Sequence, residues 1–292
     1  MGDVPDTTHD ATDGGGLPPV LEAYLLSHRG AMAPVIAEAV GALDLPPEGT
    51  VLDAGTGAGG ALATLASAAP RGRVRGVDVD PRVLALAARE IEHHDLGERV
   101  DLRAVDVATA LADPPTGGFA AIWSSELLWP GNVGVPGDTV AAMASVLAPG
   151  GTVAIFSGNY HRSVVLPGRP RLERLLATAS ELAWGLPQEG ADHYERHVRW
   201  LAEAGLVDVA LRVLPRVVGP GEDEAGRAYL LGGVFPELLA SARSHGVRAG
   251  MSDTDLEETE RLLAPGSPEH VLDEPGYHAV LPTLLATGRR AT

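Results

Sequence analysis

The stretch VLDAGTGAGG, residues 51–60, places an apolar pair, an acid and a run of glycines in succession. Val51 and Leu52 predict a short buried strand that ends at Asp53, and the residues 61–69 predict a helix. The segment between them contains four glycines and predicts a turn without obstructing side chains; these are Gly55, Gly57, Gly59 and Gly60. A strand, a glycine turn and a helix begin a nucleotide-binding unit, which receives its ligand at the carboxyl edge of an open parallel sheet.

The residue before the turn indicates which adenosine cofactor fits. The glycines satisfy GxGxxG, a pattern that suits a dinucleotide or another adenosine cofactor. A carboxylate at Asp53 would crowd a pyrophosphate, but it suits a cofactor that carries an ammonium and a sulfonium. The string DAGTGAG resembles the first motif of the class I S-adenosylmethionine-dependent methyltransferases.

Two further acids follow predicted strands. Asp78 ends the strand predicted over 73–77, 23 positions after Gly55 and close to the ~20 typical of an acid that binds a ribose diol. The stretch GVDVDP resembles the GvDxSP stretch of the same family, and helix capping suits Asp80 better than Asp78. Asp106 follows a strand predicted over 100–105 and resembles the acid of the family's third motif; exposure to solvent is the alternative.

The next two predicted strands complete the resemblance. Residues 119–123 predict a fourth strand, followed by Ser124, Ser125 and Glu126. Ala120 stands where the family usually has an acid. LAPGGTVAIFSG, residues 147–158, resembles the family's Pro-Gly-Gly turn and the fifth strand that follows it.

The resemblance implies an α/β fold with a doubly wound, mostly parallel sheet of seven strands. The implied strand order is 3-2-1-4-5-7-6, with the last-numbered strand antiparallel. S-adenosyl-L-methionine is the implied cofactor. N-terminal helices and a helical insertion before the last strand complete the expected fold.

The resemblance also implies roles for particular residues. Gly55 and Gly57 let the main chain approach the cofactor, Asp53 supports its amino acid end, Asp78 holds the ribose and Asp106 reads the adenine. Neighbouring residues assigned to the same cofactor site are Thr56, Val79, Val107 and Ser124.

Acceptor residues are expected at the same edge of the sheet. Glu126 and His161 are the candidates for a catalytic base, because both follow strands and histidine titrates near neutral pH. Residues assigned to acceptor binding are Trp129, Asn159 and Tyr160, and Trp123 is a further aromatic candidate. Plain loop positions for the two bases, and core packing for the tryptophans, are the alternatives.

The domain organisation expected is a disordered tail over 1–16 and a single methyltransferase domain over 17–292. Two amphipathic helices, from Pro18 to His28 and from Met32 to Leu43, would form an N-terminal cover over 17–45. Residues 218–276 are expected to form a helical insertion, either a lid over the substrate or a surface elaboration.

The amino-acid composition limits the kinds of partner that the protein is expected to bind. The 22 basic and 39 acidic residues give a net charge of −17, which disfavours nucleic acids and anionic membranes and suits a small-molecule acceptor, although solubility alone would account for it. There is no cysteine, hence no disulfide or thiolate site. The start resembles no signal peptide and no membrane-spanning run occurs, so a cytoplasmic protein is expected. A homodimer is left open.

The function expected is methyl transfer from S-adenosylmethionine to a small-molecule metabolite, with oxygen favoured over nitrogen and carbon. Two alternatives are an NAD-dependent oxidoreductase, disfavoured by Asp53 and by the lack of any lysine for a Tyr/Lys pair, and a non-catalytic cofactor-binding scaffold. The segment HYERH, residues 193–197, spaces His193 and His197 four apart but lacks the HExxH order and a third ligand, so no metal site is expected.

Overall fold

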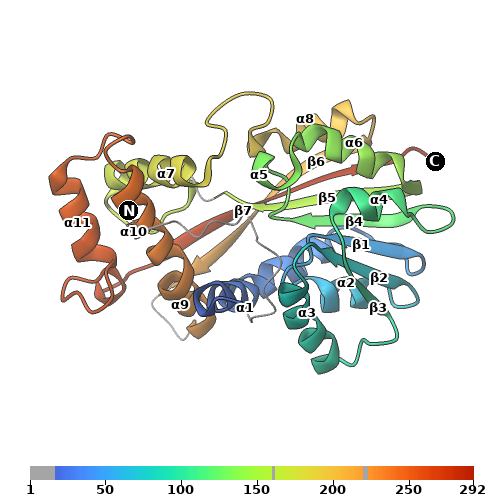
Figure 1. The fold of residues 1–292 in the computed structure, drawn as a ribbon, viewed down its shortest axis with the longest axis horizontal. Helices are drawn as coiled ribbons and strands as arrows, with labels where there is room; N and C mark the ends of the chain where they lie inside the picture. The colour runs from blue at the N-terminus through green and yellow to red at the C-terminus, as the bar shows by residue number, and fades with distance from the viewer. Residues whose placement is uncertain (1–16, 160–161, 220–222) are drawn as a thin grey trace. The chain divides into compact units, whose positions relative to one another are not determined.

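The computed structural model describes residues 17–159, 162–219 and 223–292. Its seven strands form one sheet in the order β3-β2-β1-β4-β5-β7-β6 (Figure 1), as predicted. The pairs β1–β2, β2–β3, β1–β4 and β4–β5 are parallel, and β7 runs antiparallel to β5. The strands are β1 (Thr50–Ala54), β2 (Arg73–Asp78), β3 (Val100–Ala104), β4 (Phe119–Ser125), β5 (Leu147–Gly158), β6 (Val207–Val218) and β7 (Ala279–Arg289).

Helices cover both faces of the sheet, which explains why the central strands are apolar throughout. Val51 and Trp123 belong to a core cluster with residues of α1, α2 and α3, whereas Leu52 and Ile122 belong to a second cluster with α4, α6 and α8. The helices are α1 (Pro19–Gly41), α2 (Leu62–Ala68), α3 (Pro81–His93), α4 (Val107–Ala112), α5 (Pro130–Val133), α6 (Pro136–Ser145) and α8 (His197–Glu203).

The N-terminal cover is one helix, not the two that the sequence predicted. α1 runs unbroken from Pro19 to Gly41 with Pro34 inside it. A proline within a helix removes one backbone hydrogen bond. The helix continues here because Val35, Ile36 and Ala39, just beyond the proline, are buried in the core, so tertiary packing offsets the lost bond.

The chain packs as two compact units. One unit contains 32–158, 189–214 and 283–292, and it holds both core clusters that flank the sheet. The described residues of the other lie within 17–31, 159–188 and 215–282, and this unit has a core of its own. The prediction of a single elaborated domain stays a prediction.

The second unit is mostly helical and includes the predicted insertion. Tyr229, Phe235 and Leu263 are buried in its core. One stretch departs from α geometry, a π-helical segment between α9 and α10. The elements are α7 (Pro170–Trp184), α9 (Glu224–Tyr229), η3 (Leu230–Val234), α10 (Phe235–His245), α11 (Asp253–Leu263) and η4 (Val271–Asp273).

The HYERH segment does not form one continuous helix face. His193 precedes the short helix η2 (Tyr194–Arg196), and its ring accepts a hydrogen bond from the Glu195 N–H. His197 begins α8 and is buried, with its ring edge-on to Trp200 at 5.2 Å between centroids. Within the described ranges no group of three or more His, Asp and Glu is placed to hold a metal ion; the prediction about metals stays a prediction.

No helix in the described ranges combines the length and the apolar character that a membrane crossing requires.

Candidate functional site

The glycine turn after β1 is tied to the neighbouring strand. The Thr56 N–H donates to the Val77 carbonyl of β2 at 2.8 Å, and the Thr56 hydroxyl donates to Asp53 Oδ2 at 2.6 Å. Gly55 and Gly57 both have positive φ, a conformation that glycine adopts without a steric cost. The turn is therefore held between the carboxyl ends of β1 and β2.

Asp78 fixes the other side of this turn. Its Oδ2 accepts the Gly57 N–H at 3.1 Å, and its Oδ1 accepts the Asp80 N–H at 3.0 Å. Asp80 caps α3 by accepting the Arg82 N–H, as its sequence position suggested. Asp78, placed at the end of β2, thus joins the glycine turn to the loop that leads into α3.

The two acids at this edge are poorly solvated. Asp53 exposes only 1% of its surface, and burial raises its pKa to about 7 despite the hydrogen bond from Thr56. Burial also raises the pKa of Asp78, opposed by the backbone N–H groups that it accepts. A cation beside Asp53 would return its carboxyl to the ionised form, because an opposite charge favours that form.

The predicted adenine-binding residues begin the next helix. Asp106 caps α4, with Oδ1 accepting the Thr109 N–H at 2.7 Å, and hydrogen bonds to Thr109 lower its pKa. It is exposed to solvent, as the alternative interpretation had it. Capping occupies one carboxylate oxygen, so recognition of adenine by Asp106 and Val107 stays a prediction.

Glu126 lies directly after β4 in a partly buried position. Its N–H donates to the Phe156 carbonyl of β5 at 3.0 Å, and its side-chain Oε1 accepts the Gly158 N–H. The residue has φ +53°, a left-handed conformation that is uncommon for any residue except glycine. Burial raises the pKa of its carboxyl to about 7, against the lowering effect of the Gly158 hydrogen bond.

Ser124 and Trp123 sit at the end of β4 with buried polar atoms. The Ser124 hydroxyl and the Trp123 indole nitrogen have no hydrogen-bond partner among the described residues. Trp123 is fully buried and packs on Phe156 with 5.1 Å between ring centroids. Core packing therefore accounts for Trp123, while the Ser124 hydroxyl still needs a partner.

The structure describes two of the remaining residues assigned to the acceptor, Trp129 and Asn159. Trp129 precedes α5, in the loop that follows Glu126. Asn159 belongs to the helical unit, where its N–H donates to the Pro282 carbonyl at 2.8 Å. Tyr160 and His161 lie outside the described residues. Their roles stay predictions.

The edge formed by β1 and β2 suits S-adenosylmethionine. A Cβ built at Gly57 meets no atom within 4 Å, so open space lies beside the turn. Val79, which follows β2, is 61% exposed and offers an apolar surface for an adenosine group. The buried carboxyl of Asp53 suits a cationic amino acid end. Asp78 retains lone pairs that can accept ribose hydroxyls.

Sequence reasoning missed two residues that shape this edge. Gly158 supplies the N–H that holds the Glu126 carboxyl, and Leu127 comes within 3.2 Å of a Cβ built at Gly55. The position of Gly158, last in a strand that runs parallel to β4, was the signal for the first. No sequence pattern marked Leu127.

Comparison with known proteins defines the class. Residues 51–151 match the family model described as a methyltransferase domain. This match makes residues 51–151 a methyltransferase domain with S-adenosylmethionine as its cofactor, and the seven strands have the order expected of the class I methyltransferase fold. The NAD-dependent and non-catalytic alternatives are set aside accordingly.

Two curated relatives match parts of the chain. The rRNA N(6)-adenosine-methyltransferase metl-5 of Caenorhabditis elegans is 27% identical over 150 residues, which are 51% of this chain and 70% of the relative. Ribosomal RNA small subunit methyltransferase H of a Synechococcus strain is 40% identical over 72 residues, or 25% of this chain and 23% of the relative.

Solved structures share the fold at low identity. A Bacillus halodurans C-125 protein described as a methyltransferase has a TM-score of 0.52 and 16% identity, covering 88% of this chain and 99% of its own. The YcgJ protein of Bacillus subtilis has a TM-score of 0.52 and 15% identity, covering 88% and 98%.

Proposed function

We propose that this enzyme methylates a hydroxyl group of a small-molecule acceptor. The observation that carries the proposal is the partly buried carboxyl of Glu126, which follows β4 directly, accepts the Gly158 N–H and has its pKa raised to about 7. A general base is most effective when its pKa lies near the working pH. A hydroxyl, unlike a neutral amine, must lose its proton as it accepts a methyl group, so such a base favours oxygen.

Glu126 is positioned for this role by the backbone. The Gly158 N–H holds one carboxylate oxygen, which leaves the other oxygen to accept a proton. The bound cofactor supplies an electrophilic methyl group on its sulfonium. The chain's contribution is to orient the acceptor, exclude water and take the hydroxyl proton onto Glu126.

The cofactor residues form the second part of the proposal. The main chain of the turn at Gly55 to Gly57 contacts the cofactor. The Asp53 carboxylate pairs with the cofactor's ammonium group, and the Asp78 carboxylate accepts hydrogen bonds from the ribose diol. Val79, Asp106 and Val107 face the adenine. The hydrogen bonds of Thr56 and Asp78 support this assignment, because they hold the turn in shape without using every carboxylate lone pair.

RNA is the competing acceptor, since both curated relatives carry names that refer to ribosomal RNA. The net charge of −17 argues against it, because a nucleic acid backbone is bound through many basic side chains that release counterions. A homodimer, a cytoplasmic location and a lid role for 218–276 remain predictions.

The test is transfer of a radiolabelled methyl group from S-adenosylmethionine to pooled phenols, hydroxy acids and amines, with ribosomal RNA in parallel. We expect label in a hydroxylated small molecule. Label that enters RNA alone would overturn the choice of acceptor.

The role of Glu126 is tested with Glu126→Gln. Loss of a general base lowers kcat by about a hundredfold or more, while the affinity for S-adenosylhomocysteine stays unchanged. Glu203→Gln, on the exposed face of α8, is the matched control. An unaltered rate in Glu126→Gln, with a loss in His161→Ala, would transfer the role to His161.

A further inference from the structure

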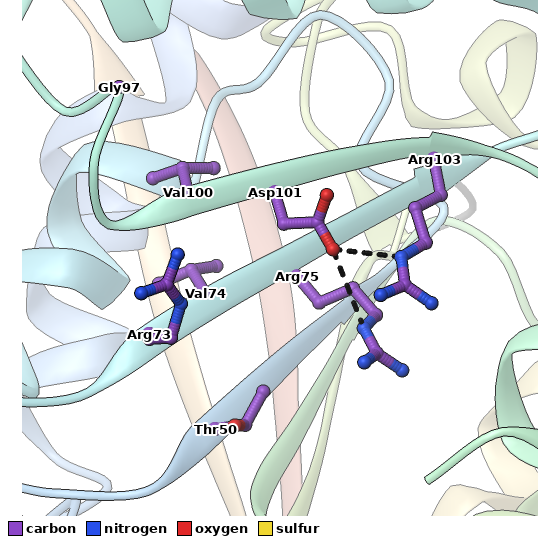
Figure 2. Close-up of a pocket in the computed structure, with 8 residues that line it drawn as sticks. All are labelled: Thr50, Arg73, Val74, Arg75, Gly97, Val100, Asp101 and Arg103. Atoms are coloured by element: carbon purple, nitrogen blue, oxygen red, sulfur yellow. Dashed lines mark hydrogen bonds and ion pairs between the residues drawn. The ribbon is translucent and has the colours of Figure 1, made fainter. Parts of the chain in front are cut away.

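A pocket lies along β1, β2 and β3 and extends from the first residues of these strands to Arg103, near the carboxyl end of β3. It has a volume of about 440 Å³, and Thr50, Arg73 and Val100, the first residues of β1, β2 and β3, line it. Arg75, Asp101 and Arg103 line it as well (Figure 2). None of the residues assigned to the cofactor lines this pocket.

Guanidinium groups dominate the pocket. Arg103 is paired, with Nε donating to Asp101 Oδ2 at 2.8 Å and Nη1 to Asp113 Oδ2 at 2.9 Å. Figure 2 shows the Asp101 carboxylate between Arg103 and Arg75. The carboxylates of Asp101 and Asp113 lie 3.9 Å from Arg75, too far for hydrogen bonds.

Arg75 is anchored but only partly hydrogen-bonded. Its side chain is 12% exposed and lies over the Phe119 ring at 5.6 Å, which fixes the guanidinium in place. Nη1 donates to the Asp113 carbonyl at 2.7 Å, and no other hydrogen bond from this side chain reaches a described residue. The other guanidinium nitrogens of Arg75 are not among the buried atoms that lack a partner. They can therefore donate hydrogen bonds to a ligand in the pocket.

Arg73 adds a guanidinium without a partner. No hydrogen bond or ion pair joins its side chain to another residue within 17–159, 162–219 or 223–292. It is two residues from Arg75 on the same strand, hence on the same side of the pleat and about 7 Å away along it. The three arginines and the two aspartates leave one positive charge uncompensated.

We propose that this pocket binds the phosphate or diphosphate group of a small ligand. A tetrahedral oxyanion offers several acceptors to arginine forks, and charge-assisted bonds of this kind are the strong ones. Figure 2 shows the two guanidinium groups extending toward opposite ends of the pocket, so the oxyanion is bound when the unpaired Arg73 side chain turns toward the free nitrogens of Arg75, with the Thr50 hydroxyl as a further donor. Asp101 holds Arg103 through a hydrogen bond, and its negative charge repels a second anion from the Arg103 end of the pocket. A local positive charge in a chain of net charge −17 makes the pocket selective for anions over the rest of the surface.

The test titrates pyrophosphate and inorganic phosphate into the full-length protein at low salt, with calorimetry and the arginine Nε–Hε resonances as readouts. We expect saturable binding that shifts the Arg73 and Arg75 signals. Arg73→Ala should weaken it about tenfold or more, as expected for a charge-assisted contact, and leave thermal stability and S-adenosylhomocysteine affinity unchanged. Arg199→Ala removes the same charge from the surface of α8 and should have no effect.

Three results would overturn the proposal. One is the lack of saturable binding up to millimolar pyrophosphate, and another is equal binding by the wild type and Arg73→Ala. The third is binding of RNA oligonucleotides at these arginines while pyrophosphate fails to bind, which would assign the pocket to a nucleic acid backbone.

Discussion

Asp53 and Glu126 are acids at or beside strand ends, the first buried and the second partly buried, and their surroundings differ. Asp53 accepts a hydroxyl hydrogen bond from Thr56 and has Asp78 as a charged neighbour, whereas Glu126 accepts one backbone N–H. A cation beside Asp53 would ionise it, while Glu126 keeps its pKa near neutrality. Two carboxyls with similar pKa values therefore suit different tasks, cofactor binding and proton transfer.

Replacing Asp78 by alanine is expected to weaken cofactor binding. The change removes the acceptor for the Gly57 N–H and, on this account, for the ribose hydroxyls. Each hydrogen bond to a charged group contributes about 1.5–3 kcal/mol, so titration calorimetry with S-adenosylhomocysteine should show a loss of at least about tenfold. Glu92→Ala on α3 is the control. Equal affinity in Asp78→Ala and wild type would refute the ribose role.

At the scale of elements, the glycine turn combines two different requirements. A Cβ at Gly59 would come within 3.1 Å of the Ala87 backbone in α3, so this glycine permits close packing of the helix. A Cβ at Gly57 would enter open space at φ +54°. Gly59 therefore allows close packing in the protein core, and Gly57 leaves space for a ligand.

The two alanine variants of these glycines should therefore separate stability from binding. Gly57→Ala should lower the free energy of unfolding by about 1 kcal/mol, because alanine is strained in a left-handed backbone conformation. It should also weaken the binding of S-adenosylhomocysteine. Gly59→Ala adds a steric conflict with α3 and should lose about 1–3 kcal/mol more in denaturant unfolding. If Gly57→Ala bound the cofactor product as well as wild type does, the open space beside the turn would not be the cofactor site.

Most strands could be predicted from their apolar residues, whereas their order was implied by the resemblance to the class I methyltransferases. β5 shows this, as its Pro-Gly-Gly turn and apolar run belong to one strand with parallel and antiparallel neighbours. The continuity of α1 could not be predicted, since a helix containing Pro34 depends on packing partners far along the chain. The π-helical turn η3 likewise has no simple periodicity.

At the scale of the whole molecule, the two units contain segments that alternate along the chain. Residues 159–188 share a unit with 215–282, and composition gave no signal for this pairing because it rests on contacts between distant segments. The cofactor acids were found from sequence because they follow strands. The Gly158 contact of Glu126 was missed because it joins residues 32 positions apart.

Buried titratable groups predict opposing effects of pH on stability. The raised pKa of Glu126 means that its contribution to the free energy of unfolding is full below about pH 4.5 and is lost as pH rises through about 7. Burial lowers the pKa of His197 to about 3, so its contribution is full above about pH 6.5 and falls as the pH falls. Each pKa unit corresponds to about 1.4 kcal/mol.

Denaturant unfolding of variants at about pH 5 and about pH 8 separates the two effects. Relative to wild type, Glu126→Gln should become more stable as the pH rises, and His197→Gln should become more stable as the pH falls. Parallel stability curves for wild type and both variants would show that these side chains titrate as they do in the unfolded chain.

The central claim is that the edge formed by β1 and β2 binds S-adenosylmethionine. Its most direct test is the thermal unfolding of the protein with S-adenosylhomocysteine, with NAD and without ligand. A ligand at about 100 times its dissociation constant stabilises the fold by about 2.7 kcal/mol, so the midpoint should rise with S-adenosylhomocysteine and stay unchanged with NAD. A rise with NAD alone would contradict the account.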